Sequence, residues 1–390
     1  MTAEPLDPEA LRPHYASFLR EGRILLTGHS HQAWPDVARE GLLEAFEQAA
    51  AHVDAKWGPA YEAADALRAY VAEEHGGRPE DVALATNSHE LQLRFLSALD
   101  LRKRPRIVTT DGEFHSLRRQ LTRLEEEGLE VTRVPAAPVV SLAERLAAEI
   151  AEDVAALMVS SVLFETSALV PDLAFAIRGA RAQGAEVLLD AYHHTGIVPW
   201  ADDPAYAGLP ADVFVSGGGY KYLQWGEGCC FLRVPPDCTL RPVFTGWFSD
   251  FANLEAPPDR PIGYGETNAD RFAGSTYDPA SHFRARRVLR FFEAQGLTLP
   301  RLRATSLRQT GRILEQLAAQ RPAVEVLTPP ERRGGFVTVR VPDAPRVVRA
   351  LRERGVYVDA RGDKLRFGPA PYVTDAEIDT ALAHFRELTA

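Results

Sequence analysis

The sequence predicts an α/β fold in which a mostly parallel sheet is covered by helices on both faces. Three observations predict this fold. Short apolar runs of strand length alternate with segments of helical periodicity over most of the chain, an order typical of parallel sheets. A length of 390 residues is enough for a large buried core and for two lobes. From about residue 280 the order changes, which indicates a second, smaller lobe.

The first part of the chain contains the alternating pattern. Apolar residues at helical spacing predict helices within residues 42–75. The strand-like runs that follow are "DVALAT", "PRIVTT", "VAALMVSSV", "AEVLLDA", "DVFVSGG" and "GCCFLRV". Helical patterns separate the first four of these runs, so strand and helix alternate along the chain.

The C-terminal part has a different pattern. Two helical stretches, "SHFRARRVLRFFEAQG" and "SLRQTGRILEQLAAQ", precede the strand-like runs "GFVTVRV", "VYVDA" and "KLRFG". Thr374 and Glu377 form a capping box at the start of the last helix. We therefore predict an N-terminal arm over residues 1–45 that packs on the small lobe and the active site, a large domain over 46–279, and a small α+β domain over 280–390.

The composition excludes several functions. A net charge of -10 argues against a general binder of nucleic acid or of anionic membranes. No segment approaches the roughly 20 apolar residues that span a bilayer, and the polar N-terminus lacks the apolar run of a signal peptide. Three cysteines, two of them adjacent, give no disulfide framework. We expect a cytoplasmic protein without nucleic-acid or membrane partners.

Polar and aromatic residues follow the predicted strands, at the sheet edge where open α/β sheets bind their ligands. They are Asn87, Ser88, His89, Glu113, Phe114, His115, Ser116, Asp190, His193 and the stretch from Ser216 to Lys221. The set combines a carboxylate, an aromatic ring, imidazoles, small hydroxyls and one lysine. Together these groups are what a site for a phosphorylated aromatic aldehyde requires.

Asp190 and Lys221 are the two central residues of this set. Asp190 ends an apolar strand, where a buried carboxylate is costly without a cation or a good donor. A protonated pyridine nitrogen is such a partner, and a helix cap or a structural ion pair is the alternative. We expect burial of Lys221 among Tyr220, Tyr222 and Trp225 to lower its pKa, so that the amine can form a Schiff base. A solvated loop lysine is the alternative.

Three glycines, residues 217–219, precede the Tyr220–Lys221 pair. Glycine permits unusual backbone angles and close approach of the backbone to a ligand. We therefore expect these glycines to leave room for a cofactor.

Five segments resemble the pyridoxal-phosphate enzymes of fold type I, in the aminotransferase class V group, and within that group the kynureninases. "DAYHHTGIVPW" is similar to the Asp-x-x-His-x-x-Gly segment of that family, and "GGGYKYLQWGEG" to its cofactor-lysine segment. "TGWF" resembles the Gly-Trp-Phe of its substrate pocket, "LTGHSHQAWP" its N-terminal Gly-Asn-Ser loop, and "LRFGPAPYVT" its Arg-x-x-Pro-x-Pro-x-Tyr segment. The matches run in order from about residue 26 to 373.

The resemblance implies a homodimer that uses pyridoxal 5'-phosphate to cleave the Cβ–Cγ bond of L-kynurenine, or of a related γ-keto amino acid, into anthranilate and L-alanine. Lys221 would bind the cofactor and move protons, Asp190 would pair with the pyridine nitrogen, and Tyr220 would bind the phosphate and act as an acid. The further cofactor-binding residues would be Ser88, His89, Phe114, Ser116, His193 and Trp247, with Ser275 and Thr276 of the second subunit. The substrate-binding residues would be His29, Ser30 and Arg366, of which Arg366 holds the α-carboxylate.

Three positions depart from the family pattern. Glu90 stands where kynureninases have a threonine in the phosphate helix, and we expect it to form a capping pair with Asn87 by turning back onto the backbone. Leu117 replaces an aspartate near the ring, which removes one cofactor hydrogen bond. Asp250 replaces a histidine that bears on recognition of the aryl group. The aryl-ketone substrate is therefore open.

Other functions fit parts of the pattern. A class V aminotransferase needs the same lysine, aspartate and arginine. Cysteine desulfurases share the fold but use a loop cysteine, whereas Cys229, Cys230 and Cys238 follow Lys221 and are interpreted as core residues. A metal site is suggested by "HSH" at 29–31 and "HHT" at 193–195, but neither has further ligands at suitable spacing, and we predict no metal. A non-catalytic relative is the last alternative.

Overall fold

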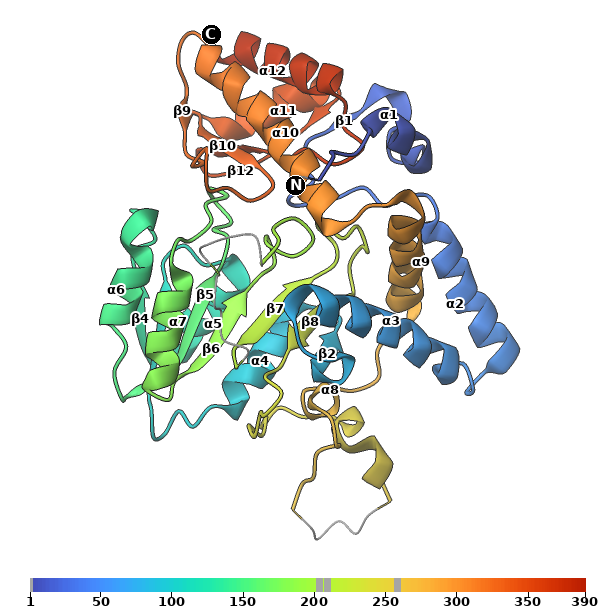
Figure 1. Ribbon diagram of the computed structural model, residues 1–390, viewed down its shortest axis with the longest axis vertical. Coiled ribbons are helices and arrows are strands. Elements are labelled where there is room, and N and C mark those ends of the chain that lie inside the picture. Colours follow the sequence, from blue (N-terminus) through green and yellow to red (C-terminus); the bar gives the residue numbers. More distant parts are fainter. Residues whose placement is uncertain (1–2, 201–205, 207–211, 256–260) are drawn as a thin grey trace.

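The computed structural model describes residues 3–200, 206, 212–255 and 261–390. Positions 1 and 2 of the predicted N-terminal arm, and positions 201–205, 207–211 and 256–260 of the predicted large domain, lie outside the described residues. Figure 1 shows a large body built around a sheet, with the C-terminal region in orange and red above it. No helix in the described ranges is long and apolar enough to cross a membrane.

The large body contains a sheet of seven strands in the order β2-β8-β7-β6-β5-β3-β4. The strands from β7 to β4 run parallel, while β8 is antiparallel to both of its neighbours. This arrangement confirms the predicted mostly parallel sheet. The strands are β2 (Val82–Ala85), β3 (Arg106–Thr110), β4 (Glu130–Val134), β5 (Val154–Ser160), β6 (Glu186–Asp190), β7 (Phe214–Gly218) and β8 (Cys230–Arg233).

Six of these strands coincide with the predicted apolar runs, and β4 does not. It lies at the edge of the sheet, and Val134 is its one buried residue. The sequence "EVTRV" therefore lacks the apolar run by which a buried strand is predicted.

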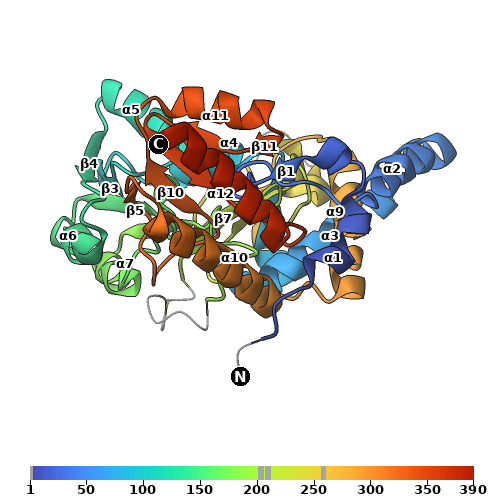
Figure 2. The same cartoon turned by 90° about the horizontal axis from the view of Figure 1, so that it is seen from above.

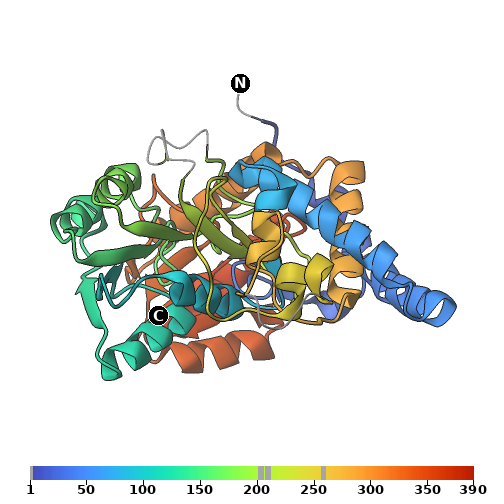
Figure 3. The ribbon, with the colours of Figure 1, turned by 90° about the horizontal axis from the view of Figure 1, so that it is seen from below.

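Helices cover both faces of the sheet (Figures 2 and 3). On one face lie α4 (Ser88–Ala98) and α5 (His115–Glu126), and on the other lie α6 (Leu142–Ala148) and α7 (Leu173–Ala182). The buried residues of α7 recur at helical spacing, at Leu173, Ala176, Ile177 and Ala180, which gives this helix one apolar face for the sheet.

A group of helices lies at the other end of the body (Figure 1). The predicted helical stretch 42–75 is two helices, α2 (Ala38–His52) and α3 (Trp57–His75), and both pack against α9 (Ala280–Gln295). Val53, with a φ of 51°, ends α2. The short helix α8 (Asn268–Arg271) packs near β2.

The C-terminal region is a small α+β lobe. Its antiparallel sheet has the order β12-β13-β10-β9. Its elements are α10 (Leu299–Ala319), β9 (Glu325–Val326), β10 (Val337–Arg340), α11 (Ala344–Glu353), β11 (Val356–Tyr357), β12 (Asp359–Arg361), β13 (Lys364–Phe367) and α12 (Asp375–Thr389). The predicted capping box of Thr374 and Glu377 is confirmed at the start of α12. The predicted strand "VYVDA" divides between β11 and β12.

The N-terminal segment lies along this C-terminal lobe (Figure 1). After α1 (Pro8–Leu11), strand β1 (Ile24–Leu25) pairs in parallel with β11, and a bridge between Thr27 and Gly368 continues the pairing. The Nη1 of Arg12 also lies 2.7 Å from a carboxylate oxygen of Glu377. These contacts bring the loop after β1 to the end of β13, while the exact domain boundaries stay predictions.

Candidate active site

The carboxyl ends of β6 and β7 bring Asp190, His193 and Lys221 together, and we call these three residues the Lys221 cluster. Asp190 is the last residue of β6 and lies opposite Ser216 of β7. Lys221 follows β7 by three residues and is only 5% exposed. Its Nζ lies 3.0 Å from Nε2 of His193. Parallel neighbouring strands place their ends at one sheet edge, which explains why residues 31 positions apart meet here.

Burial controls the charge of this cluster. Removal from water lowers the pKa of Lys221 to about 7, although the nearby Asp190 carboxylate opposes the change. Burial raises the pKa of Asp190, opposed by a hydrogen bond from the Tyr192 N–H and by Lys221. A large fraction of Lys221 is therefore a neutral, nucleophilic amine near neutral pH.

The aromatic rings around Lys221 differ in part from those predicted. The Nζ lies 4.5 Å from the ring centre of Tyr192, 5.6 Å from that of Tyr220 and 5.7 Å from that of Phe114. Tyr222 and Trp225, which were expected to bury the lysine, are themselves buried but are not among the rings that Nζ contacts. Of the three predicted rings, only that of Tyr220 therefore lies against the amine, and Tyr192 and Phe114 supply the other two contacts.

The three glycines before Tyr220 are closely packed against protein side chains. None of them has a positive φ. A Cβ at Gly218 would lie 2.2 Å from the Tyr192 hydroxyl, and one at Gly219 would lie 2.3 Å from the Trp225 ring. Gly218 and Gly219 are therefore required by the close packing of protein side chains, and the expectation that these glycines leave room for a cofactor stays a prediction.

Across from this edge, the small lobe and the N-terminal loop supply Arg366, Asp359 and His29, which we call the Arg366 cluster. Arg366 is 2% exposed, and its Nε lies 2.8 Å from Oδ1 of Asp359. The Nε2 of His29 lies 2.9 Å from the same oxygen. Arg366 is close enough to Lys221 to lower the pKa of that amine. The two clusters therefore face one site from the two lobes.

Asp359 was not among the predicted site residues, although the sequence contains a signal for it. It pairs directly with Arg366 across the hairpin of β12 and β13. The turn "RGDK" between these strands contains Gly362, with a φ of 59°. Recognising a tight hairpin turn there would have placed the carboxylate opposite the arginine.

The start of α4 is the predicted phosphate site. Asn87 caps the helix by accepting a hydrogen bond from the Glu90 N–H at 3.0 Å, as predicted. The Glu90 carboxylate, however, bonds to the side chains of Thr86, Asn87 and Arg94 rather than to the backbone, so this part of the prediction was wrong. The backbone of Ser88 hydrogen-bonds to the buried Cys230, and His89 is exposed at the helix start.

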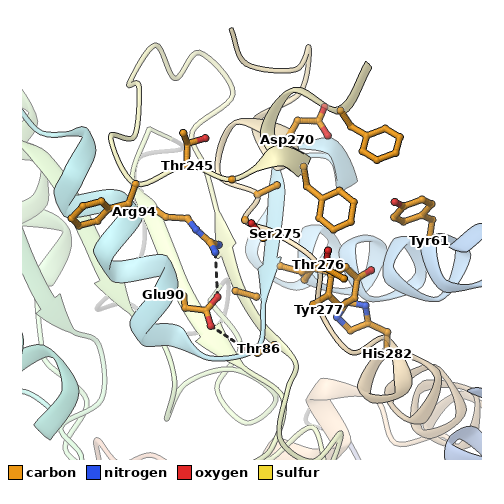
Figure 4. Close-up of a pocket in the computed structure, with 18 of the residues that line it drawn as sticks. Tyr61, Thr86, Glu90, Arg94, Thr245, Asp270, Ser275, Thr276, Tyr277 and His282 are labelled. Atoms are coloured by element: carbon orange, nitrogen blue, oxygen red, sulfur yellow. Dashed lines mark hydrogen bonds and ion pairs between the residues drawn. The ribbon is translucent and has the colours of Figure 1, made fainter. Parts of the chain in front are cut away.

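Ser275, Thr276 and Trp247 lie apart from Lys221 within one chain. Ser275 and Thr276 line a pocket of about 780 Å³, together with Glu90 and Arg94 of α4 (Figure 4). Trp247, 44% exposed, stacks on Phe248 at a ring distance of 4.5 Å. Among the described residues, their ring and pocket neighbours do not include the Lys221 cluster.

The remaining predicted residues have local environments. Ser30 is buried and donates to the carbonyl of Thr27, and Ser116 is half-buried in the first turn of α5. Leu117, one of the departures, is 1% exposed and belongs to the hydrophobic core. Asp250, another, interrupts a 3₁₀ segment at 247–253 and accepts a hydrogen bond from Asn253.

The cysteines and histidines do not show the features of the alternative sites. Cys229 and Cys230 are buried in the core, and burial raises their pKa values to about 12 and about 11. They are thus protonated and poorly nucleophilic at neutral pH. His194 stacks on Trp200 at 3.6 Å. Within the described ranges, no group of three or more His, Cys, Asp or Glu residues could hold a metal ion.

The Lys221 cluster fits the cofactor that the sequence motifs imply. The carboxylate of Asp190 accepts one hydrogen bond, from the Tyr192 N–H, among the residues the structure describes. The buried Oγ of Ser216 beside it has no partner within the same set. Both acceptors are suited to a bound polar ring, and the Lys221 amine is suited to an aldehyde. The positive end of helix α4 at Ser88 and His89 favours a phosphate, although the Ser88 N–H itself already donates to Cys230.

Comparison with known proteins agrees with this fit. Residues 302–385 match the family described as Kynureninase C-terminal domain. Isopenicillin N epimerase of Streptomyces clavuligerus is 30% identical over 331 residues, which are 78% of this chain and 79% of the epimerase. Kynureninase of Pseudomonas fluorescens is 31% identical over 63% of this chain and 58% of that enzyme. Kynureninase of Xanthomonas axonopodis pv. citri (strain 306) is 32% identical over 51% of this chain and 48% of that enzyme.

Solved structures share the fold. A variant of C-DES with glycine covalently linked to its PLP cofactor has a TM-score of 0.84, at 19% identity over 96% of this chain and 99% of that one. The apo cysteine desulfurase of Thermococcus onnurineus NA1 has a TM-score of 0.81, at 20% identity over 100% and 99%. The chain therefore belongs to the pyridoxal-phosphate-dependent enzymes of fold type I, in the aminotransferase class V group with isopenicillin N epimerase and kynureninase, and its cofactor is pyridoxal 5'-phosphate.

Proposed function

We propose that this enzyme uses water to cleave the Cβ–Cγ bond of L-kynurenine, or of a related γ-keto α-amino acid, which gives anthranilate, or the corresponding acid, and L-alanine. The observation that carries the proposal is the placement of one buried amine, Lys221, and one buried guanidinium, Arg366, at the same site. An α-amino acid has the two groups that such a pair recognises. The match of residues 302–385 to the kynureninase C-terminal family, which includes Arg366, supports the choice of reaction.

The residues would divide the work as follows. Arg366 holds the α-carboxylate, and Lys221, neutral in part near pH 7, takes the α-proton and returns protons later. His193 fixes the amine through its 3.0 Å hydrogen bond. Pyridoxal phosphate, when bound, withdraws electrons from the α-carbon. Asp190, Phe114, Tyr220, Ser88 and His89 would hold this cofactor.

The direct test is the release of anthranilate from L-kynurenine, followed by its fluorescence. We expect multiple turnovers with equimolar L-alanine as the second product. A cofactor-loaded enzyme that releases neither anthranilate from L-kynurenine nor 3-hydroxyanthranilate from 3-hydroxykynurenine would contradict the proposed reaction. Formation of an α-keto acid with loss of the amino group would indicate an aminotransferase instead.

A second candidate function is epimerisation at the α-carbon. The alignment with isopenicillin N epimerase favours it, because it covers 79% of that enzyme, against 58% of the Pseudomonas fluorescens kynureninase. Epimerisation needs the same removal of the α-proton but no cleavage of a carbon–carbon bond. Chiral chromatography of the amino acids recovered after incubation separates the two functions, since only an epimerase yields the D-isomer.

We further propose that the enzyme is a cytoplasmic homodimer in which Ser275 and Thr276 complete the phosphate site of the second subunit. Both residues are exposed in the single chain, and they lie on a pocket next to the phosphate helix α4 (Figure 4). Trp247, Phe251 and Phe244 are exposed apolar residues in the same region. Such a patch is typical of a surface that another protein covers.

A mixing experiment tests this arrangement. Lys221→Ala and a Ser275→Ala/Thr276→Ala double variant are each prepared with low activity and then exchanged into hybrid dimers. If the hydroxyls act across the interface, one site of each hybrid is intact, and the mixture recovers about a quarter of wild-type activity. No recovery, despite hybrids seen by native mass spectrometry, would contradict the arrangement.

A further inference from the structure

We infer that Asp359 is a positioning residue: it fixes the plane of the Arg366 guanidinium so that its remaining N–H groups meet the substrate's α-carboxylate. This inference rests on the proposed use of an α-amino acid, but not on the bond that is later cleaved. It assigns to Asp359 a role in substrate recognition through another residue.

Asp359 and Arg366 form a pair of well-defined geometry. The Nε and Nη2 of Arg366 lie 2.8 and 2.5 Å from the two carboxylate oxygens of Asp359. Two parallel hydrogen bonds fix both the position and the plane of a guanidinium. The two residues face each other in register across β12 and β13, so the strand pairing itself sets their separation.

Arg366 has more N–H donors than its described protein partners use. A guanidinium has five N–H groups. Two of them go to Asp359, and Nη1 donates a third to the carbonyl of Phe164 at 2.7 Å. Among the described residues, one N–H of Nη1 and one N–H of Nη2 therefore remain without an acceptor, and a carboxylate can accept a hydrogen bond from each. Asp359 orients the arginine without saturating it.

Asp359 is itself held in place by His29. His29 is fully buried, stacks on Phe336 at a ring distance of 4.5 Å, and donates from Nε2 to Asp359 at 2.9 Å. Burial lowers the pKa of His29 to about 4, so this donor is a neutral imidazole. A Cβ at Gly368 would lie 2.1 Å from Nδ1 of His29, so only glycine leaves room for this ring.

The contacts of Asp359 also fix its charge. Although burial alone raises the pKa of Asp359, the contacts with His29 and Arg366 hold it well below its usual range. The carboxylate is therefore ionised throughout the working pH range and neutralises Arg366. Without it, the guanidinium would be a buried charge lacking both its counter-ion and two of its acceptors.

The test compares two ligands on the cofactor-loaded enzyme. L-Alanine has the α-carboxylate, and ethylamine is the same molecule without it. Binding of each is titrated through the change in cofactor absorbance. The variants are Asp359→Asn and Asp359→Glu, which keeps the charge but moves the carboxylate. The control is Asp363→Asn, which removes a carboxylate from Arg340 on the exposed part of the same sheet.

We expect Asp359→Asn to weaken L-alanine binding at least about tenfold and to leave ethylamine binding unchanged. Asp359→Glu should show the same selective loss, because position rather than charge alone is required. In an Arg366→Lys background, Asp359→Asn should cause no further loss, since Asp359 acts through the guanidinium. Asp363→Asn should match the wild type for both ligands.

Three results would overturn the inference. They are unchanged or tighter L-alanine binding in Asp359→Asn, equal losses for both ligands, or full additivity with Arg366→Lys. L-Alanine has no γ-carbonyl, so these titrations are independent of kynurenine cleavage. An enzyme that binds L-alanine selectively but releases no anthranilate would refute the proposed reaction and leave the role of Asp359 intact.

Discussion

The Lys221 cluster and the Arg366 cluster lie at one site but are built in opposite ways. The Lys221 cluster comes from two neighbouring strands of one sheet, β6 and β7, and its polar atoms are incompletely paired. The carboxylate of Asp190 has one hydrogen bond among the described residues, and the Oγ of Ser216 beside it has none. The Arg366 cluster comes from two segments distant in sequence, the N-terminal loop and the β12–β13 hairpin, and its charged groups have protein partners on several sides.

This difference indicates which of the two clusters is fully formed before the cofactor and the substrate bind. Unpaired buried polar atoms are costly unless a ligand satisfies them, so the Lys221 cluster is complete only with the cofactor. The Arg366 cluster is already oriented for a carboxylate in the free protein. Variants in or next to each cluster should therefore have different effects.

The largest expected effect follows from removing the amine of the Lys221 cluster. Lys221→Ala should lower kcat for anthranilate release at least about a thousandfold, because both the cofactor linkage and the proton acceptor are lost. The matched control is Lys364→Ala, which breaks an ion pair with Glu165 at 2.8 Å and should retain activity. Near-normal turnover by Lys221→Ala would refute the assignment.

Removal of the guanidinium affects the other cluster. Arg366→Ala should raise KM about a hundredfold and change kcat less, because it removes carboxylate binding and leaves Asp359 without its partner. Steady-state kinetics with L-kynurenine measure both constants. A fall in kcat with KM unchanged would mean that Arg366 acts on the chemical step rather than on binding.

A smaller effect tests the packing under Lys221. Gly218→Ala would place a methyl group 2.2 Å from the Tyr192 hydroxyl, and we expect a loss of about 2 to 3 kcal/mol in the free energy of unfolding. Gly179→Ala, within α7 and with no atom near its Cβ, should instead stabilise by about 0.5 to 1 kcal/mol. Urea denaturation compares them. Equal stabilities would show that the sheet edge around Tyr192 yields easily.

The smallest effect concerns Glu113, which is 1% exposed beneath the Lys221 cluster and accepts hydrogen bonds from Thr110 and Ser160. Burial raises its pKa from 4.5 to about 7. Its contribution to stability is therefore complete below about pH 4.5 and is lost as the pH rises through about 7. Glu113→Gln should match the wild type at pH 5 and exceed it by about 1 to 2 kcal/mol at pH 8. A variant less stable than the wild type at pH 8 would contradict this ionisation.

The same comparison explains what the sequence could predict. Asp190, His193 and Lys221 follow apolar strands, and parallel strand ends meet at one edge, so their proximity follows from local pattern. The partnership of Asp359 and His29 depends on contacts across 330 positions, to which local pattern is blind. The packing role of Gly218 and Gly219 could not be predicted, because Tyr192 and Trp225, which require them, are brought there only by the tertiary fold.

The most direct test of the account is to map the lysine that binds the cofactor. The chain has four lysines, Lys56, Lys103, Lys221 and Lys364, and Lys221 is the buried one among them. The protein is incubated with pyridoxal 5'-phosphate, reduced with borohydride and digested, and the labelled peptide is identified by mass spectrometry. The account predicts one label per chain, on Lys221. A label on another lysine, or no label on a protein saturated with cofactor, would contradict it.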